Sequence, residues 1–287
     1  MQEKKRGRTH SRWLLPAALV LAGAAWFENF TLSTSTVTAA CAALPEAFSG
    51  LRIVQISDLH GRRFDAESRY LLELVRLQSP DLIALTGDLA DEFTDFSILP
   101  PLLDGLTALA PTFYVTGNHE WVLSREKREA LFSMLDAAGV VRLQNEYRLL
   151  KKGQASIVLA GVDDPNGPYD QKRPAQLVRE IRQSRGRDAY ILMLSHRNDE
   201  LDLWANMGIQ TVLCGHGHGG IVRLPFVGAV FGTHLDLFPD YTAGLYQKGQ
   251  TSMIVSRGLG GSRKLPLRIG NRPEIVTVIL KAESGKV

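Results

Sequence analysis

The strongest constraint in this chain is a series of short apolar runs, each closely followed by residues that can ligate a metal. Asp-Leu-His, Gly-Asp, Gly-Asn-His-Glu, a single His and Gly-His-Gly-His follow the runs at 51–56, 82–85, 113–115, 190–194 and 211–214. The runs are often β-branched and bounded by Gly, Asp or Pro, which is typical of buried strands. Ligands bind at the carboxyl ends of strands in open α/β sheets. We therefore expect the polar clusters to meet at one rim.

Helical patterns alternate with these runs. Apolar residues recur on one side of 66–78 and 125–138, and two shorter helices are expected over 174–181 and 201–207. Strands that alternate with helices predict an α/β fold whose sheets are covered by helices. In the last third, strands at 253–256 and 275–280 have no clear helix between them, so we expect mixed or antiparallel additions there.

The donor types in the clusters predict the kind of metal. They are Asp, His and Asn without cysteine, which suits Mn, Fe, Co or Zn and argues against a thiolate site. Their number exceeds the four ligands of a tetrahedral zinc. Two ions about 3.5–4 Å apart can share one carboxylate and activate one hydroxide. Taken singly, most clusters also fit turns or a core histidine, but two histidines in the glycine run 215–220 offer no core packing.

The order of these motifs resembles the calcineurin-like metallophosphoesterase superfamily over most of 51–280. The stretches 215–220, 256–260 and 271–275 are most similar to its bacterial, membrane-associated YaeI-like phosphodiesterase branch. That branch more often has Thr at the position of Gly217, which is not a ligand position. The resemblance implies a two-sheet β-sandwich flanked by helices, with two divalent metal ions whose identity stays open between Mn, Fe, Zn and Co.

The resemblance also implies a role for each residue. One ion would be held by Asp58, His60 and His218, and a second by Asn118, His196 and His216. Asp88 would bridge both ions. His119 would protonate the leaving oxygen or stabilise its charge, because a departing alkoxide needs a proton or positive charge.

These features predict a dinuclear phosphoesterase that uses a metal-activated hydroxide, with phosphodiesters as the favoured substrates. One alternative is a lipid-nucleotide pyrophosphatase of the UDP-2,3-diacylglucosamine type, because relatives in lipid A synthesis cleave that substrate. A catalytically silent scaffold on the same fold is an alternative of another class, although all seven ligand positions are filled.

The excess positive charge of +3 sits mainly at the N-terminus, and the near-neutral body argues against dedicated nucleic-acid binding. The expected substrate is a phosphorylated small molecule or lipid.

The N-terminal segment predicts contact with a membrane. Lys4, Lys5, Arg6, Arg8 and Arg12 precede the uncharged run Trp13–Phe27, which Glu28 ends. The run is short for a transmembrane helix of about 20 residues, so a cleaved signal peptide and an interfacial helix stay open. We favour an uncleaved single-pass anchor, with the catalytic domain on the non-cytoplasmic side. The predicted division is 1–30 basic N-terminus and anchor or signal, 31–50 linker and first strand, and 51–287 catalytic domain.

Three weaker signals leave alternatives open. Arg257 precedes a glycine-rich turn and is either a substrate-phosphate contact or an ordinary surface arginine. Asp163 and Asp164 fit a turn or the support of a ligating histidine. The apolar stretch Ile221–Phe238 is either a flap that covers substrate or faces lipid, or a core hairpin, which is the favoured interpretation.

Overall fold

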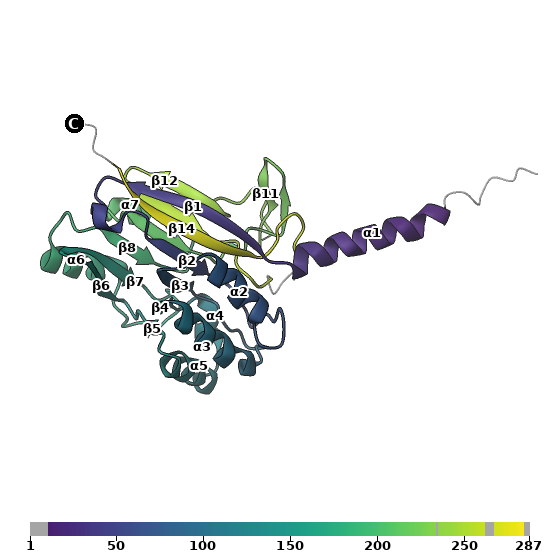
Figure 1. Ribbon diagram of the computed structural model, residues 1–287, viewed down its shortest axis with the longest axis horizontal. Helices are drawn as coiled ribbons and strands as arrows, with labels where there is room; N and C mark the ends of the chain where they lie inside the picture. Colours follow the sequence, from purple (N-terminus) through teal and green to yellow (C-terminus); the bar gives the residue numbers. More distant parts are fainter. Residues whose placement is uncertain (1–10, 234, 262–266, 284–287) are drawn as a thin grey trace, which may run out of the picture.

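The computed structural model describes residues 11–233, 235–261 and 267–283, which form two mixed six-stranded sheets packed face to face (Figure 1). The first sheet has the order β1-β14-β2-β3-β4-β5, formed by Ser33–Cys41, Glu274–Ala282, Arg52–Ile56, Leu82–Thr86, Thr112–Val115 and Val141–Arg142. The second has the order β12-β13-β9-β8-β7-β6, formed by Gly244–Lys248, Thr251–Val255, Thr211–Cys214, Ile191–Leu194, Ala155–Gly161 and Glu146–Lys152.

Parallel strands form the centre of each sheet. Strands β2, β3 and β4 are parallel, and so are β7, β8 and β9. The additions from the last third are partly antiparallel, because β12 pairs antiparallel with β13 and β14 pairs antiparallel with β2. The predicted mixed α/β fold is therefore confirmed, and the polar clusters follow strands that run in register.

Three apolar layers hold the sandwich together. Ile53, Val115 and Leu159 belong to the core between the two sheets. Alternate residues such as Val54 point to the outer face of the first sheet, where α2 (Arg69–Leu77), α3 (Leu99–Leu109) and α5 (Arg125–Ala137) pack. Helices α6 (Pro174–Arg185) and α7 (Leu201–Asn206) cover the second sheet. Because both faces of each sheet are covered, the central strands are continuous apolar runs rather than alternating ones.

Two elements differ from the sequence-based expectation. Helix α3 was not among the predicted helices, and its sequence contains Pro100 and Pro101. Both prolines lie at the start of the helix, where a missing N–H loses no helical hydrogen bond. Strand β1 lies in the segment expected to hold a linker and a first strand, and it pairs in parallel with β14 at the edge of the first sheet.

Helix α1 (Ser11–Phe30) projects from one end of the sandwich (Figure 1). Among the described residues, no helix combines the length and the apolar character needed to cross a bilayer. The predicted spanning anchor is thus not supported. The last turn instead docks on protein, since Asn29 is buried against the backbone of Arg268. The basic residues at positions 4–8 lie outside the described part of the chain, as do the side chains of Arg12 and Trp13.

The segment Ile221–Phe238 forms a small hairpin of β10 (Val222–Leu224) and β11 (Gly228–Phe231). The predicted hairpin is present, but its placement in the core was wrong. Phe226 is fully exposed, and Leu237 and Phe238 are largely exposed. The hairpin adjoins the attachment of α1, because Val222 bridges to Ile269 beside Arg268. The exposed apolar residues of the segment therefore lie on the α1 end of the molecule.

Candidate metal centre

All seven predicted ligands and His119 come together at the carboxyl ends of β2, β3, β4, β8 and β9. Three groups have their donor atoms within 4.8 Å of one another: Asp58, His60 and His218; His60, Asp88 and His119; and Asp88, His196 and His216. The amide Oδ1 of Asn118, at the start of α4 (Asn118–Val122), is 3.2 Å from His196 Nε2. The first and third groups match the two predicted ligand sets, apart from Asn118 as an amide donor. Their ligation of metal stays a prediction.

Asp88 lies between the two sets. Its Oδ2 is 3.2 Å from His196 Nε2 and 3.6 Å from His60 Nε2. Its Oδ1 accepts the backbone N–H of His119 at 2.8 Å. The carboxylate is almost completely buried. This central position suits a carboxylate that serves two cations.

Asp58 connects the loop after β2 to the loop after β9. Its two carboxylate oxygens accept the backbone N–H of His216 at 3.0 and 3.1 Å. The Nε2 atom of His218 is 3.7 Å from its Oδ1. Asp58 therefore fixes the Gly-His-Gly-His loop as well as offering a donor of its own.

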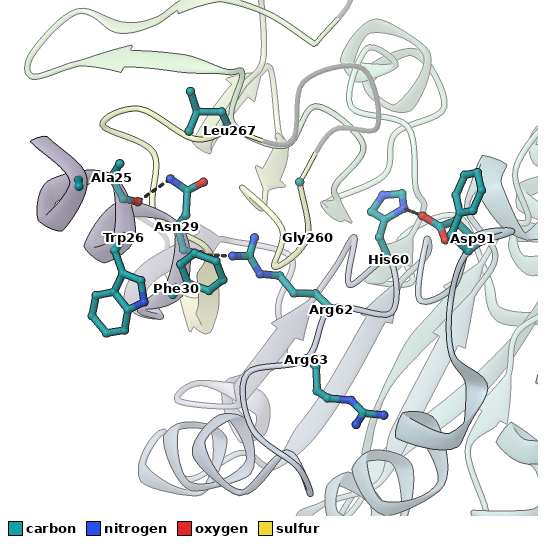
Figure 2. Close-up of a pocket in the computed structure, with 13 residues that line it drawn as sticks. Ala25, Trp26, Asn29, Phe30, His60, Arg62, Arg63, Asp91, Gly260 and Leu267 are labelled. Atoms are coloured by element: carbon teal, nitrogen blue, oxygen red, sulfur yellow. Dashed lines mark hydrogen bonds and ion pairs between the residues drawn. The ribbon is translucent and has the colours of Figure 1, made fainter.

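The second ring nitrogen of His196 is hydrogen-bonded, and a carboxylate lies near the second ring nitrogen of His60. His196 Nδ1 is 2.8 Å from the carbonyl oxygen of Thr86, which turns Nε2 toward Asp88. His60 Nδ1 is 3.4 Å from Asp91 Oδ2, the contact that Figure 2 draws. Metal-ligating histidines commonly direct the other nitrogen at a carbonyl or carboxylate in this way. Sequence reasoning missed Asp91, because an acidic residue three positions after Asp88 has no distinctive spacing.

The backbone at the site is held in a sparsely populated conformation. Five predicted ligands have left-handed φ angles: Asp58 (50°), His60 (48°), Asp88 (54°), His216 (65°) and His218 (49°). Such a conformation costs roughly 1–3 kcal/mol per residue and persists only where the surroundings impose it. Outliers of this kind concentrate at functional sites, so the local strain independently points to the same residues.

Glycines in the motifs allow the loops to approach the carboxylates. A Cβ atom on Gly117 would lie 2.2 Å from Asp88 Oδ1, and one on Gly215 would lie 2.3 Å from Asp58 Oδ2. No side chain fits at those distances. The glycines of the Gly-Asn-His-Glu and Gly-His-Gly-His motifs are therefore required by close packing around the two aspartates.

Glu120 is hydrogen-bonded to the loops after β3 and β4. Its carboxylate accepts the backbone N–H groups of Asp88 at 3.0 Å, Leu89 at 2.7 Å and Gly117 at 2.8 Å. Burial and the negative charge of Asp88 raise the pKa of Glu120 to about 7. The sequence motif contains this residue, but its spacing gave no sign of its role. Glu120 positions the loops after β3 and β4.

The carboxylates of Asp88 and Asp58 make the electrostatic potential at His196 negative. Burial lowers the pKa of His196, but the carboxylates of Asp88 and Asp58 outweigh this effect and raise that pKa to about 10. Burial likewise acts to raise the pKa of Asp88, and His196 with His60 holds it well below the usual value. A potential that attracts a proton to His196 also attracts a divalent cation, which would displace that proton on binding.

The residues present fit a bound metal. Both ring nitrogens of His60 and the Nδ1 atom of His218 are buried and have no hydrogen-bond partner among the described residues, although buried polar atoms normally have one. Coordination would account for such orphaned nitrogens. Carboxylate, imidazole and amide donors suit Mn, Fe, Co or Zn.

Two arginines near the site, Arg257 and Arg197, are held by buried carboxylates. Arg257 forms an ion pair with Glu274 at 3.0 Å and donates to Ser33 at 3.1 Å, so its substrate role stays a prediction. Arg197, which sequence reasoning missed, pairs with the buried Asp164 at 2.6 Å. One guanidinium nitrogen of Arg197 is 3.1 Å from His216 Nε2. Asp164 thus reaches a predicted ligand through Arg197.

A two-sheet α/β sandwich with adjacent Asp/His clusters at the ends of its strands defines a metallophosphoesterase-type protein. The profile of the family described as "Calcineurin-like phosphoesterase" matches residues 51–220. The chain belongs to this family and is a hydrolase that acts on phosphoester bonds. The family is metal-dependent, and the three donor groups are where this chain can bind metal.

Relatives extend the match beyond these residues. The chain is 31% identical over 267 residues to "Uncharacterized metallophosphoesterase YkuE" of Bacillus subtilis. This match covers 90% of this chain and 89% of the relative. It is 31% identical over 234 residues to "Phosphodiesterase YaeI" of Escherichia coli, with 80% and 82% covered. A zebrafish (Danio rerio) relative named "Transmembrane protein with metallophosphoesterase domain" is 27% identical, with 83% and 55% covered.

Among solved structures, the sulfate thiohydrolase SoxB of Thermus thermophilus matches with a TM-score of 0.50 and 15% identity. The match covers 83% of this chain and 57% of that one. At this identity the likeness concerns the fold alone.

Proposed function

We propose that the protein is a dinuclear phosphodiesterase. The observation that carries this proposal is the place of Asp88, within reach of His60 on one side and of His196 on the other. Asp58, His60 and His218 would hold one cation, and Asn118, His196 and His216 the other. The name of the YaeI relative supports a diester as the substrate.

In the proposed reaction, the metal ions and the residues of the chain would have different roles. When bound, the two cations would supply positive charge to the phosphate oxygens and lower the pKa of the attacking water. The backbone N–H of His119 is held by Asp88, and its ring lies 4.7 Å from that of His60, at the edge of the centre. From there His119 would give a proton to the leaving oxygen. Glu120 and Asp58 would keep the loops in register during the reaction.

Metal removal and restoration test the proposal. We expect chelation to abolish hydrolysis of bis(p-nitrophenyl) phosphate and Mn²⁺ to restore it, with two ions bound per chain. The diester should be cleaved faster than p-nitrophenyl phosphate. Full activity in metal-free protein would refute the proposal. Two bound ions without hydrolysis of either ester would favour the silent scaffold.

We also propose that α1 binds the membrane surface. Leu19, Val20 and Trp26 are 65%, 71% and 59% exposed, and Phe226 on the neighbouring hairpin is fully exposed. Exposed apolar residues that gather at one end of a molecule mark interaction surfaces. Full-length protein should float with phospholipid vesicles, and a chain that starts at Thr31, which lacks α1 and keeps β1, should remain at the bottom of the gradient. Equal behaviour of both would contradict this proposal.

A further inference from the structure

A large pocket opens directly beside the metal centre. Its volume is about 830 Å³, within the usual range of small-molecule sites. His60 and Asp91 line one end, so the pocket is continuous with the candidate metal centre. The opposite wall comes from α1, as Figure 2 shows with Trp26 and Phe30 across from His60.

The two ends of the pocket differ in chemistry. Near the metal centre, the pocket presents imidazole, carboxylate and the guanidinium of Arg62. Along α1 it presents the apolar residues Ala22, Ala25, Trp26 and Phe30. A molecule that fits both ends must carry an anionic group at one end and an apolar chain at the other.

Specific contacts fix α1 as a wall of this pocket. The side chain of the buried Asn29 donates to the Arg268 carbonyl at 3.0 Å and accepts the Arg268 N–H at 2.9 Å. Arg62 donates to the carbonyl of Asn29, and its guanidinium lies 5.4 Å from the ring centre of Phe30. The guanidinium of Arg272 lies 4.5 Å from the ring centre of Phe27. The last turn of α1 is therefore held against the site by its own side chains and by two arginines.

Arg62 sits where the apolar and polar ends meet. It reaches α1 through Asn29 and lines the pocket together with His60. A guanidinium has five N–H donors, so the bond to Asn29 leaves capacity for a phosphate oxygen. Arg62 is thus placed to contact the anionic group of a molecule whose tail lies on α1.

We infer that the natural substrate is a phosphodiester with a long alkyl or acyl chain, whose chain lies along α1. This inference rests on the proposed phosphodiesterase function and adds the substrate class. The phosphate would lie at the metal centre and against Arg62, and the chain would lie against Ala25 and Trp26. Residues of α1 thereby act as specificity determinants, not as parts of the reacting site.

A series of chain lengths tests this inference with the Mn²⁺-loaded, full-length protein. The substrates are ethyl, butyl and octyl p-nitrophenyl phosphodiesters, each below its critical micelle concentration. In each reaction water adds to phosphorus and the bond to the nitrophenyl oxygen breaks, which releases nitrophenolate and the alkyl phosphate. We expect kcat/KM to rise at least about tenfold from ethyl to octyl, because burial of each methylene favours the bound state.

Two variants of α1 form a matched pair. Ala25→Trp fills the pocket and should remove the advantage of the octyl ester, so that kcat/KM becomes similar for the octyl and ethyl esters. Val20→Trp adds the same side chain at a position that is 71% exposed and does not line the pocket. This control should keep the full dependence on chain length. Calorimetry should likewise show that octylphosphonate binds more tightly than ethylphosphonate, and that only Ala25→Trp removes the difference.

The outcomes separate this inference from the proposed function. Absence of hydrolysis of all three esters would refute the phosphodiesterase itself. Hydrolysis that does not depend on chain length would overturn the role of the pocket and leave the phosphodiesterase intact. An equal loss in Ala25→Trp and Val20→Trp would also overturn it, since the effect would then come from α1 as a whole.

Discussion

The metal centre and the α1 end of the molecule are built in opposite ways. At the centre, Asp58, Asp88 and His196 are buried, and each makes polar contacts to more than one loop. At the α1 end, large apolar side chains such as Trp26 and Phe226 are exposed. The first region is fixed by buried charges and hydrogen bonds, whereas the second offers apolar surface that the described residues leave uncovered.

This difference separates the two tasks of the enzyme. The centre supplies chemistry that any phosphoester needs, so damage there should affect all substrates alike. In the inferred binding mode, the α1 wall would touch only the apolar part of a substrate, so damage there should affect only long-chain esters. The following substitutions test whether the two regions act separately.

The largest effect is expected at Asp88. Asp88→Ala should empty both metal positions and reduce hydrolysis of short and long esters to background, because in the proposed dinuclear site this one carboxylate would serve both cations. Metal analysis and rates on the ethyl and octyl esters check this. Asp202→Ala is the matched control, since Asp202 is exposed and its ion pair with Lys248 lies on the surface. Unchanged occupancy of both positions would contradict a bridging role.

His119→Ala should keep its metals and lose rate by roughly 10²–10⁴-fold, the usual contribution of a general acid. The loss should be large for a poor leaving group such as an alkoxide and small for nitrophenolate, which departs without a proton. Steady-state rates on bis(p-nitrophenyl) phosphate and on a dialkyl phosphate measure the contrast. An equal loss on both esters would show that His119 is not the acid.

Asp91→Asn should weaken metal binding about 10–100-fold, the usual cost of changing the partner of a ligating histidine. The asparagine retains an oxygen for the backbone N–H of Phe93, so the loop should keep its conformation. Titration of metal-free protein with Mn²⁺ gives the dissociation constant, with Asp202→Asn as the control. Unaltered affinity would mean that Asp91 does not orient His60.

The smallest effect is expected at the exposed hairpin. Phe226→Ser should change the free energy of unfolding by less than about 0.5 kcal/mol, because the side chain is fully exposed. Leu159→Ala, in the core between the sheets, should cost about 2–5 kcal/mol. Urea denaturation of the two variants compares them. A large loss in Phe226→Ser would show that the hairpin is packed in solution and would remove the contrast between the two regions.

Much of the site could be predicted because its motifs are local. Asp58 and His60 follow directly after a recognisable strand, and the glycines beside His216 and His218 exclude a role in core packing. Elements that depend on burial were less predictable. Helix α3 begins with prolines that suggest a loop, and the exposure of the 221–238 hairpin could not be inferred from its apolar composition.

The sequence by itself determined the fold class, the donor types and the order in which they appear, because strand periodicity and motif spacing are properties of neighbouring residues. Only the tertiary structure decided which distant groups meet. Asp91 faces His60, Arg197 joins Asp164 to His216, and α1 closes a pocket beside the metal centre. These contacts join segments up to more than two hundred positions apart, such as Asn29 and Arg268. The sequence around these residues does not indicate their partners, because the contacts form only when the two sheets pack and bring the loops to one rim.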